Sequence, residues 1–357
     1  MAGNSFGDLF RVTTFGESHG GGVGVVIDGC PSRIGLSPED FARDMARRRP
    51  GRSSFDTPRR EDDQVEILSG VFKDLTTGAP ITLFIRNRDA DSRPYEILNQ
   101  LFRPGHGDYT YYEKYGHFDF RGGGRYSGRE TAARVAAGVV AGKILEPLGV
   151  RVMAYTLELG GIRVKSIDLD SVEKNPLYCP DPNASEQMEE AMSKAREEGD
   201  SLGGIAEVLV TGCPAGLGEP VFDKLDADLA KAIMSVGAVK GVEIGAGFGA
   251  AALKGSENND PIIPDGFETN RAGGILGGIS NGDEIILRAA MKPIPSISQE
   301  QDTIDRQGRA AKIKLTGRFD VSVIPRIIPV LEAMVRIVLA DHYLRSRTMT
   351  QRVPKKP

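Results

Sequence analysis

The amino-acid sequence predicts an α+β fold. Short runs rich in Val and Ile, which are typical of strands, alternate irregularly with a few well-marked helices, and long loops rich in glycine and proline separate them. The regular strand–helix–strand order of a doubly wound parallel sheet is missing. The length of 357 residues allows one large domain or two, and no linker composition or internal repeat divides the chain. We therefore expect one domain over residues 1–357.

Five helices are predicted from local signals. The first begins at Ser37, where Pro38 suits the first turn and Asp40 completes a capping box, and it ends before a Pro-Gly pair. A helix over about 130–148 carries alanines and glycines at i, i+4 spacing, which let another backbone approach closely. We expect this helix to be buried. The other three are expected over about 185–198, 223–236 and 329–347.

Runs rich in Val and Ile place the strands. The candidates cover residues 23–28, 65–68, 81–86, 205–211, 284–289 and 320–324. Two loops, over residues 260–282 and 293–308, are longer than ordinary connections between elements. We expect these loops to be functional or mobile.

The charge composition argues against a nucleic-acid partner. The chain has 45 Lys and Arg residues and 49 Asp and Glu residues, a formal net charge of -4. It therefore lacks the overall positive field of a nucleic-acid binder. Its arginines are nevertheless clustered, at residues 47–60 and 103–129. Local positive charge in an acidic protein suits a small, highly anionic ligand better than a polymer.

Cysteine usage and the N-terminal sequence indicate a cytoplasmic protein. The three cysteines are widely spaced and form no Cys-x-x-Cys pair, so neither a disulfide framework nor a zinc site is indicated. The N-terminal sequence lacks the continuous apolar core of a signal peptide, and no later segment is long enough to span a membrane. We expect no membrane partner and no bound metal.

The stretch over residues 103–131 concentrates groups that bind anions. In its RGGGRYS sequence, three glycines permit backbone conformations in which consecutive N–H groups converge on one anion. The helix that follows would point its N-terminal dipole at the same place. Arginines add forked donors for carboxylate and phosphate oxygens, at Arg103, Arg121, Arg125 and Arg129. A glycine-rich turn among solvated arginines is the alternative interpretation.

Two histidines are candidates for acid–base chemistry. Small residues flank His19, and a proline and two glycines hold His106 without crowding its ring. An accessible imidazole can act as a general acid or base near neutral pH. Loop histidines bonded to the backbone remain the alternative. We interpret His117 and His342 as structural.

Other catalytic patterns are missing or weak. The sequence has no Gly-x-Ser-x-Gly elbow and no P-loop motif. The glycines at 20, 22 and 24 lead into a strand and not into a helix, so a dinucleotide-binding loop is a weak interpretation. The segments 272–280 and 292–296 could wrap a planar, phosphorylated cofactor, and Arg318 stands beside Asp320. Simple turns and a surface ion pair are the alternatives.

The motifs FGESHGGGVG, RRRPG, RREDDQVEILSGVF, RPGHGDYTYYEKYG, RGGGRYSGRET and AGGILGGIS together resemble the chorismate synthase family. The resemblance extends over residues 3–347. It implies a β-α-β sandwich, with helices enclosed between antiparallel sheets, and a homotetramer. It also implies a lyase of the shikimate pathway, which supplies aromatic amino acids. This enzyme eliminates phosphate from 5-enolpyruvylshikimate 3-phosphate in an anti-1,4 reaction to give chorismate, with reduced FMN and no net redox change.

The resemblance also implies roles for individual residues. His19 would protonate the leaving phosphate, His106 would stabilise the reduced flavin, and Asp320 would help flavin N5 act as a base. The arginines expected around the substrate and the phosphates are Arg48, Arg52, Arg103 and Arg129. The residues expected to contact FMN are Arg125, Tyr126, Ser127, Gly237, Ala238, Gly277, Lys292, Pro293, Ile294, Pro295, Ser296 and Arg318.

The sequence departs from the family pattern at two positions. Phe319 replaces a histidine that many members carry, and Ser54 replaces an arginine, for which Arg52 would substitute. The reductant stays open between NADPH and an external flavin reductase. Two other functions also stay open: a non-catalytic protein that binds nucleotides or polyanions, and an NADPH-dependent flavin reductase.

Overall fold

The computed structural model describes residues 3–49, 51, 62–89, 93–317 and 319–349. Three residues of the sequence analysis, Arg52, Ser54 and Arg318, lie outside the described residues. The prediction of one domain stays a prediction.

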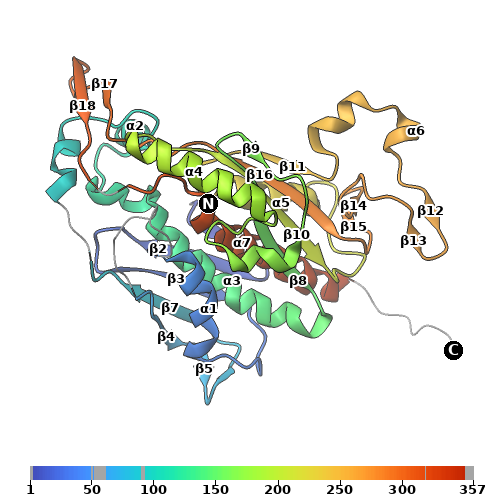
Figure 1. Cartoon of the computed structure of the whole chain (residues 1–357). Helices are drawn as coiled ribbons and strands as arrows, with labels where there is room; N and C mark the ends of the chain where they lie inside the picture. The colour runs from blue at the N-terminus through green and yellow to red at the C-terminus, as the bar shows by residue number, and fades with distance from the viewer. Residues whose placement is uncertain (1–2, 50, 52–61, 90–92, 318, 350–357) are drawn as a thin grey trace.

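Two five-stranded antiparallel sheets form the outer layers of the described part of the chain (Figure 1). The first sheet contains, in spatial order, β1 (Ser5–Phe6), β2 (Arg11–Gly16), β3 (Gly22–Asp28), β7 (Ile81–Arg86) and β4 (Val65–Ser69). The second contains β11 (Val239–Ile244), β16 (Ile285–Met291), β10 (Gly204–Thr211), β8 (Arg151–Leu159) and β9 (Ile162–Arg163).

Two long helices fill the space between the sheets. The helix α3 (Thr131–Leu145) packs on β3 and β7, α7 (Ile324–Met349) packs on β8 and β10, and the two helices pack on each other. A Cβ atom at Gly138 of α3 would overlap the side chain of Ala333 of α7, so the close approach requires glycine there. This arrangement confirms the α+β fold, with helices enclosed between antiparallel sheets.

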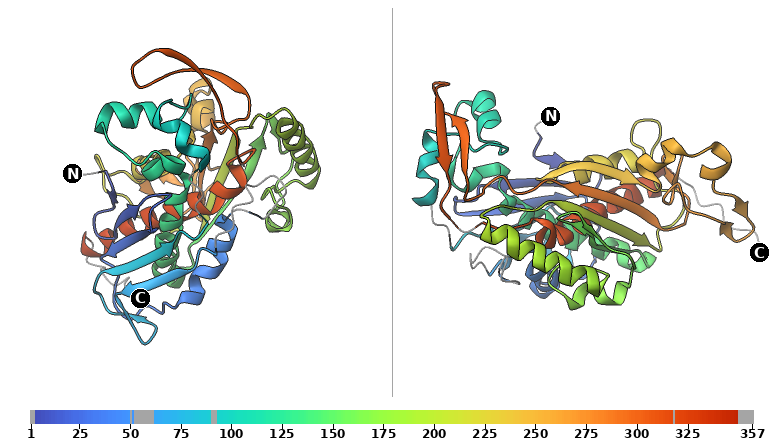
Figure 2. Two further views of the ribbon diagram at one scale, coloured as in Figure 1. Left: turned by 90° about the vertical axis from the view of Figure 1, so that its left-hand side faces the viewer. Right: turned by 45° about the horizontal axis from the view of Figure 1, so that its top comes forward.

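Shorter elements surround this sandwich. The other helices are η1 (Pro38–Phe41), α1 (Ala42–Arg48), η2 (Arg93–Asn99), α2 (Asp108–Tyr115), η3 (Arg121–Tyr126), η4 (Gly128–Glu130), η5 (Glu146–Leu148), η6 (Leu169–Lys174), α4 (Pro182–Glu197), α5 (Leu225–Met234), η7 (Gly247–Ala252) and α6 (Gly255–Asn258). Four small hairpins pair β5 (Val71–Phe72) with β6 (Leu75–Thr76), β12 (Ile262–Ile263) with β13 (Gly266–Phe267), β14 (Ile275–Leu276) with β15 (Ile279–Ser280), and β17 (Glu300–Ile304) with β18 (Ala310–Lys314). Figure 2 shows β12–β13 and β17–β18 at opposite ends of the molecule.

The predicted strand over residues 320–324 is wrong. Ile324 begins α7, and its N–H donates to Ser322 Oγ at 3.3 Å, so this apolar run leads into a helix. The last helix therefore begins earlier than expected, and Pro329 lies inside it. The expected loop over 293–308 contains the strand β17. Its hairpin partner, β18, lies just beyond the end of that predicted loop. A short apolar run fits a strand and a buried helix start equally well.

A buried ion network joins α1 to α7. Arg47 Nη1 and Nη2 donate to Glu332 at 2.6 and 2.9 Å, and Arg336 bridges Glu332 and Asp44. The backbone N–H of Ala154 on β8 donates to the same Glu332 at 2.9 Å. One carboxylate thus fixes two helices and the second sheet.

His342 lies in the core, and its Nε2 is 3.0 Å from the carboxylate of Asp228, which fits a structural histidine. None of the described helices is long and apolar enough to cross a membrane.

Candidate active site

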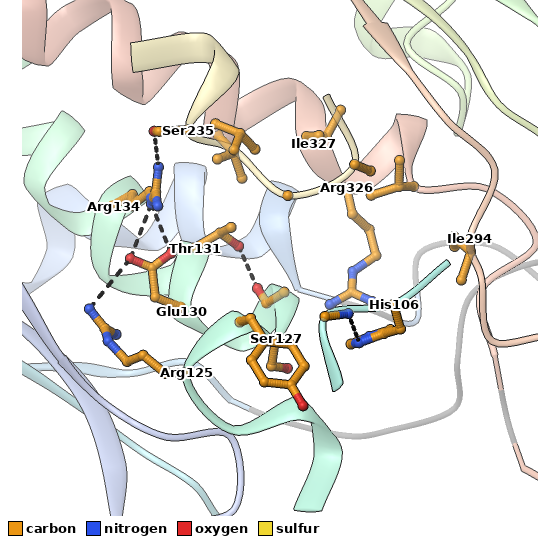
Figure 3. A pocket seen from close by; sticks show the side chains of 18 of the residues that line it. His106, Arg125, Ser127, Glu130, Thr131, Arg134, Ser235, Ile294, Arg326 and Ile327 are labelled. Carbon is orange, nitrogen blue, oxygen red and sulfur yellow. Dashed lines mark hydrogen bonds and ion pairs between the residues drawn. The ribbon is translucent and has the colours of Figure 1, made fainter. Parts of the chain in front are cut away.

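A cavity of about 510 Å³ opens beside the first turns of α3 and α7 (Figure 3). Its volume is in the range typical of small-molecule sites. The wall brings together segments that are far apart in the sequence, at residues 105–107, 125–131, 235–238, 292–295 and 320–330. Each of these segments contains at least one residue that was predicted from the sequence.

Positive charge exceeds negative charge in the described wall. Five cations line it, Arg48, Arg125, Arg134, Lys292 and Arg326, against two carboxylates, those of Glu130 and Asp320. Arg134 Nε donates to Glu130 at 2.8 Å, Arg125 Nη2 lies 4.0 Å from the same carboxylate, and Arg326 pairs with Asp320. The described wall thus has three more cations than carboxylates, a surplus that suits an anionic ligand, although Asp63 behind the wall pairs with Arg48.

Arg48 is the most deeply buried of these cations. Its side chain is 2% exposed, and its three nitrogens donate to Thr131 Oγ1 at 3.2 Å, Asp63 Oδ2 at 3.0 Å and the Gly128 carbonyl at 2.8 Å. Burial lowers the pKa of the Arg48 guanidinium to about 10, and Arg326 and Arg129 add to the lowering although Asp63 opposes it. An anion in the cavity would relieve this repulsion.

Arg129 does not line the cavity. Its guanidinium pairs with Asp63, and it donates to Asn87 Oδ1 at 2.8 Å and to the Arg86 carbonyl at 3.0 Å. Burial alone would raise the pKa of Asp63, but Arg48 and Arg129 outweigh it and the pKa is lowered. Asp63 thus holds two of the predicted arginines together. Asp63 was not predicted from the sequence, although an acidic run, Glu61-Asp62-Asp63, directly follows the arginine cluster.

His106 is a neutral, oriented imidazole. Its Nδ1 accepts the N–H of Gly107 at 2.9 Å, so the proton of the neutral ring sits on Nε2. Burial lowers its pKa, and Arg103 and Lys292 lower it further, while Asp108 at 3.4 Å opposes the shift. The ring therefore stays neutral at pH 7.

Asp108 organises the wall behind His106. It accepts two bonds of 2.8 Å from the Arg103 guanidinium and one of 2.7 Å from the hydroxyl of Tyr126. Although burial opposes the shift, the hydrogen bonds and charge of Arg103 hold the pKa of Asp108 well below its usual range. Arg103 also donates to Ser296 at 3.3 Å. Arg103 and Ser296 therefore support the cavity wall and do not line it.

The triple glycine separates the two predicted histidines. All three residues have positive φ, with values of 59°, 87° and 51° at Gly122, Gly123 and Gly124, which confirms that the turn requires glycine. A Cβ at Gly122 would overlap the imidazole of His19, and one at Gly123 would lie 3.3 Å from His106 Cε1. His19 and His106 thus lie against neighbouring glycines of the same turn.

Several other predicted residues meet at the cavity. They are Arg125, Tyr126, Ser127, Gly237, Ala238, Lys292, Ile294, Pro295 and Asp320. His19 and Pro293 are not in its wall, and His19 packs edge-on against Tyr95 at 5.2 Å between ring centroids. Gly277 is also not in the wall. It lies between β14 and β15, before the start of β16, whereas Lys292 follows the end of that strand.

Five polar residues of the cavity wall were not predicted from the sequence: Thr14, Glu130, Arg134, Ser235 and Arg326. Glu130 and Arg134 are four residues apart, a spacing that predicts an ion pair on a helix. No group of three or more His, Cys, Asp or Glu side chains in the described ranges could hold a metal ion.

The fold and this wall define a class of α+β sandwich proteins with a cationic cavity at the helix ends. The chain matches the chorismate synthase family model over residues 10–344. It is 58% identical over 354 residues to a chorismate synthase of Syntrophus aciditrophicus, covering 98% of this chain and 100% of the relative. For that of Methanosarcina mazei the identity is 55% over 355 residues, covering 97% of each chain. A crystal structure of chorismate synthase superposes with a TM-score of 0.76 at 33% identity, covering 95% of this chain and 93% of the other. The chain therefore belongs to the chorismate synthase family, whose members are carbon–oxygen lyases.

Proposed function

We propose that this protein eliminates phosphate from 5-enolpyruvylshikimate 3-phosphate to give chorismate, the last step of the shikimate pathway. The observation that carries the proposal is the cation surplus around Arg48 in a cavity that also contains neutral His106. A substrate with two carboxylates and a phosphate would match that surplus. Family membership supports the reaction class.

We propose reduced FMN as the cofactor, and the described residues fit it. Aromatic side chains offer a surface for a flat ring: the rings of Tyr111 and Tyr126 are 4.2 Å apart between centroids, and Tyr126 lies 5.2 Å from His106. Arg125 and Lys292 supply positive charge for a phosphate in the same wall. The residues proposed to hold FMN are Arg125, Tyr126, Ser127, Gly237, Ala238, Lys292, Ile294 and Pro295. When bound, reduced FMN would supply electron density as the allylic C–O bond breaks, with no net redox change.

The protein groups would then position charges and protons. Neutral His106 would present its proton at Nε2, because Gly107 occupies Nδ1. Tyr126 would keep its hydroxyl proton, since burial and Asp108 raise its pKa. Arg48 would stabilise negative charge on the departing phosphate. His19 would donate the proton that this phosphate accepts, which requires the phosphate to reach past Gly122. Asp320, already paired with Arg326, would be the carboxylate near the base.

We also propose a cytoplasmic homotetramer. Large apolar side chains are exposed in the stretch of sequence that connects the end of β10 to the start of β16. Phe222 is 92% exposed, Phe248 79% and Ile262 80%. Exposed apolar residues of this size support burial against other subunits. Analytical ultracentrifugation of the purified protein would test the assembly.

The reductant, NADPH or an external flavin reductase, would be identified by NADPH oxidation in the presence of FMN.

An anaerobic assay tests the proposed reaction. The purified protein would be mixed with the substrate and chemically reduced FMN, and phosphate and chorismate would be followed together. The proposal predicts equal formation of both products, none with oxidised FMN, and a loss of orders of magnitude in His19→Ala with FMN binding retained. A folded protein that binds FMN but releases no phosphate would instead be a binding protein.

A further inference from the structure

Glu130 is a buried carboxylate in a cavity that otherwise favours anions. It precedes α3, and its residue exposure is 8%. Arg134 Nε donates to its two oxygens at 3.1 and 2.8 Å (Figure 3). The hydroxyl of Thr14 donates to Oε1 at 2.9 Å. A negative charge in this wall repels an anionic ligand. Glu130 must therefore have a role other than binding that ligand directly.

The bond from Thr14 orients Arg125. A threonine hydroxyl has one proton, and Thr14 gives it to Glu130, so its lone pairs are left to accept. The Arg125 Nη2 donates to that same Thr14 oxygen, and to the Thr14 carbonyl at 2.8 Å. Glu130 itself is 4.0 Å from Arg125 Nη2. The carboxylate therefore fixes the direction in which Thr14 can receive Arg125.

The bond from Arg134 reaches another segment of the wall. Arg134 Nη1 donates to Ser235 Oγ at 2.7 Å, and Ser235 gives its own proton to the Ala232 carbonyl at 2.6 Å. Ser235 begins the segment 235–238 of the cavity wall. Arg125, Thr14, Glu130, Arg134 and Ser235 thus form one continuous chain of polar contacts, and all five line the cavity. Figure 3 shows four of them, Arg125, Glu130, Arg134 and Ser235.

We propose that Glu130 is a positioning residue: it holds the guanidinium groups of Arg125 and Arg134 in place and thereby connects segments 125–127 and 235–238 as one FMN-binding wall. This proposal rests on the FMN site proposed above. Glu130 acts through the two arginines and does not touch the reacting atoms.

The direction in which Glu130→Gln changes FMN affinity distinguishes a positioning role of Glu130 from a purely electrostatic one. If Glu130 contributed only its negative charge, Glu130→Gln would make the cavity more positive and would tighten the binding of anionic FMN. If Glu130 positions the arginines, the same variant weakens FMN binding. We expect a loss of about tenfold or more, as is typical when the support of a binding residue is removed.

Glu207 provides a matched control. It is 6% exposed, accepts from Arg288 Nε at 2.7 Å and from the hydroxyl of Tyr155, and so resembles Glu130 in its bonding. It does not line the cavity. Glu207→Gln should therefore leave FMN affinity unchanged.

FMN binding would be titrated by fluorescence quenching for wild type, Glu130→Gln and Glu207→Gln. A thermal melt on a separate sample of each would first establish that the protein is folded. Riboflavin, which lacks the phosphate, would be titrated in parallel. We expect weaker FMN binding in Glu130→Gln alone, with a smaller change for riboflavin. Unchanged or tighter binding in folded Glu130→Gln would overturn the positioning role. Failure of the wild type to bind FMN would overturn the proposed cofactor site itself.

A second pair of variants keeps the test sharp if Glu130→Gln does not fold. Thr14→Val removes the hydroxyl that connects Glu130 to Arg125, and Arg134→Lys keeps the charge but loses the fork. Both should weaken FMN binding, and combining them should cost less than the product of the single effects if they act as one unit. Wild-type affinity in both folded variants would contradict the proposal.

Discussion

Arg47 and Arg48 are neighbours in the sequence, and both are buried, but they have opposite surroundings. Arg47 extends from α1 toward α7, where its guanidinium donates hydrogen bonds to both carboxylate oxygens of Glu332. Although burial opposes the shift, Glu332 and Asp44 raise the pKa of Arg47. Arg48 points to the cavity, where burial and two further arginines lower its pKa to about 10 although Asp63 opposes the shift.

The difference separates a structural cation from a binding cation. The charge of Arg47 is balanced within the protein, so it contributes to the attachment of α1. The charge of Arg48 is only partly balanced, because Asp63 also serves Arg129. An incompletely compensated, buried guanidinium is therefore the feature that marks the anion site.

The largest effect is expected for catalysis in Arg48→Met. Loss of charge-assisted hydrogen bonds to the substrate, at about 1.5–3 kcal/mol each, should lower kcat/KM by about two to four orders of magnitude. Arg47→Met, assayed well below its melting temperature, should stay close to wild type. Steady-state kinetics of both variants would check this, and equal losses would break the comparison.

The second largest effect is on the free energy of unfolding. Here we expect Arg47→Met to be more damaging than Arg48→Met, the reverse of the order for catalysis. Arg47→Met leaves the carboxylate of Glu332 with weaker compensation and should cost about 3–5 kcal/mol in the free energy of unfolding. Arg48→Met should cost less, because Asp63 keeps Arg129 and the repulsion with Arg326 is removed. Urea denaturation would measure both, and a larger loss in Arg48→Met would argue that Arg48 is structural.

These contrasts indicate what the sequence could predict. The strands β3 and β7, the helix α3 and the need for glycine in the triple-glycine turn followed from local patterns. The pairing of Arg129 with Asp63, outside the cavity wall, could not be predicted, because a local motif does not show where a side chain turns. The Glu130–Arg134 pair has a local helical spacing, but Arg134 contacts Ser235 and Glu130 contacts Thr14 across distant segments, which no local pattern reports.

A smaller effect concerns inorganic phosphate. Because an anion relieves the repulsion at Arg48, millimolar phosphate should stabilise the wild type by about 1–3 kcal/mol, depending on its affinity. The stabilisation should persist in Arg47→Met and disappear in Arg48→Met. Thermal melts at constant ionic strength would measure it, with chloride as the control. Persistence in Arg48→Met would place the phosphate site elsewhere.

The smallest effect is on pH dependence. Burial lowers the pKa of His106, so the unfolded chain, with an ordinary value of about 6.5, binds more protons than the folded one. The stability that neutral His106 provides is therefore present above about pH 6.5 and is lost as the pH falls below it. His106→Gln should flatten the unfolding free energy between pH 7 and 5. Equal slopes in the two proteins would contradict this.

The most direct test of the account is a crystal structure of the protein with FMN and the substrate bound. We predict FMN in the 510 Å³ cavity between His106 and segment 235–238, with anionic groups of the ligands within hydrogen-bonding distance of Arg48 and Arg326. Ligands bound away from this cavity, with Arg48 in contact only with protein groups, would contradict the assignment of the active site.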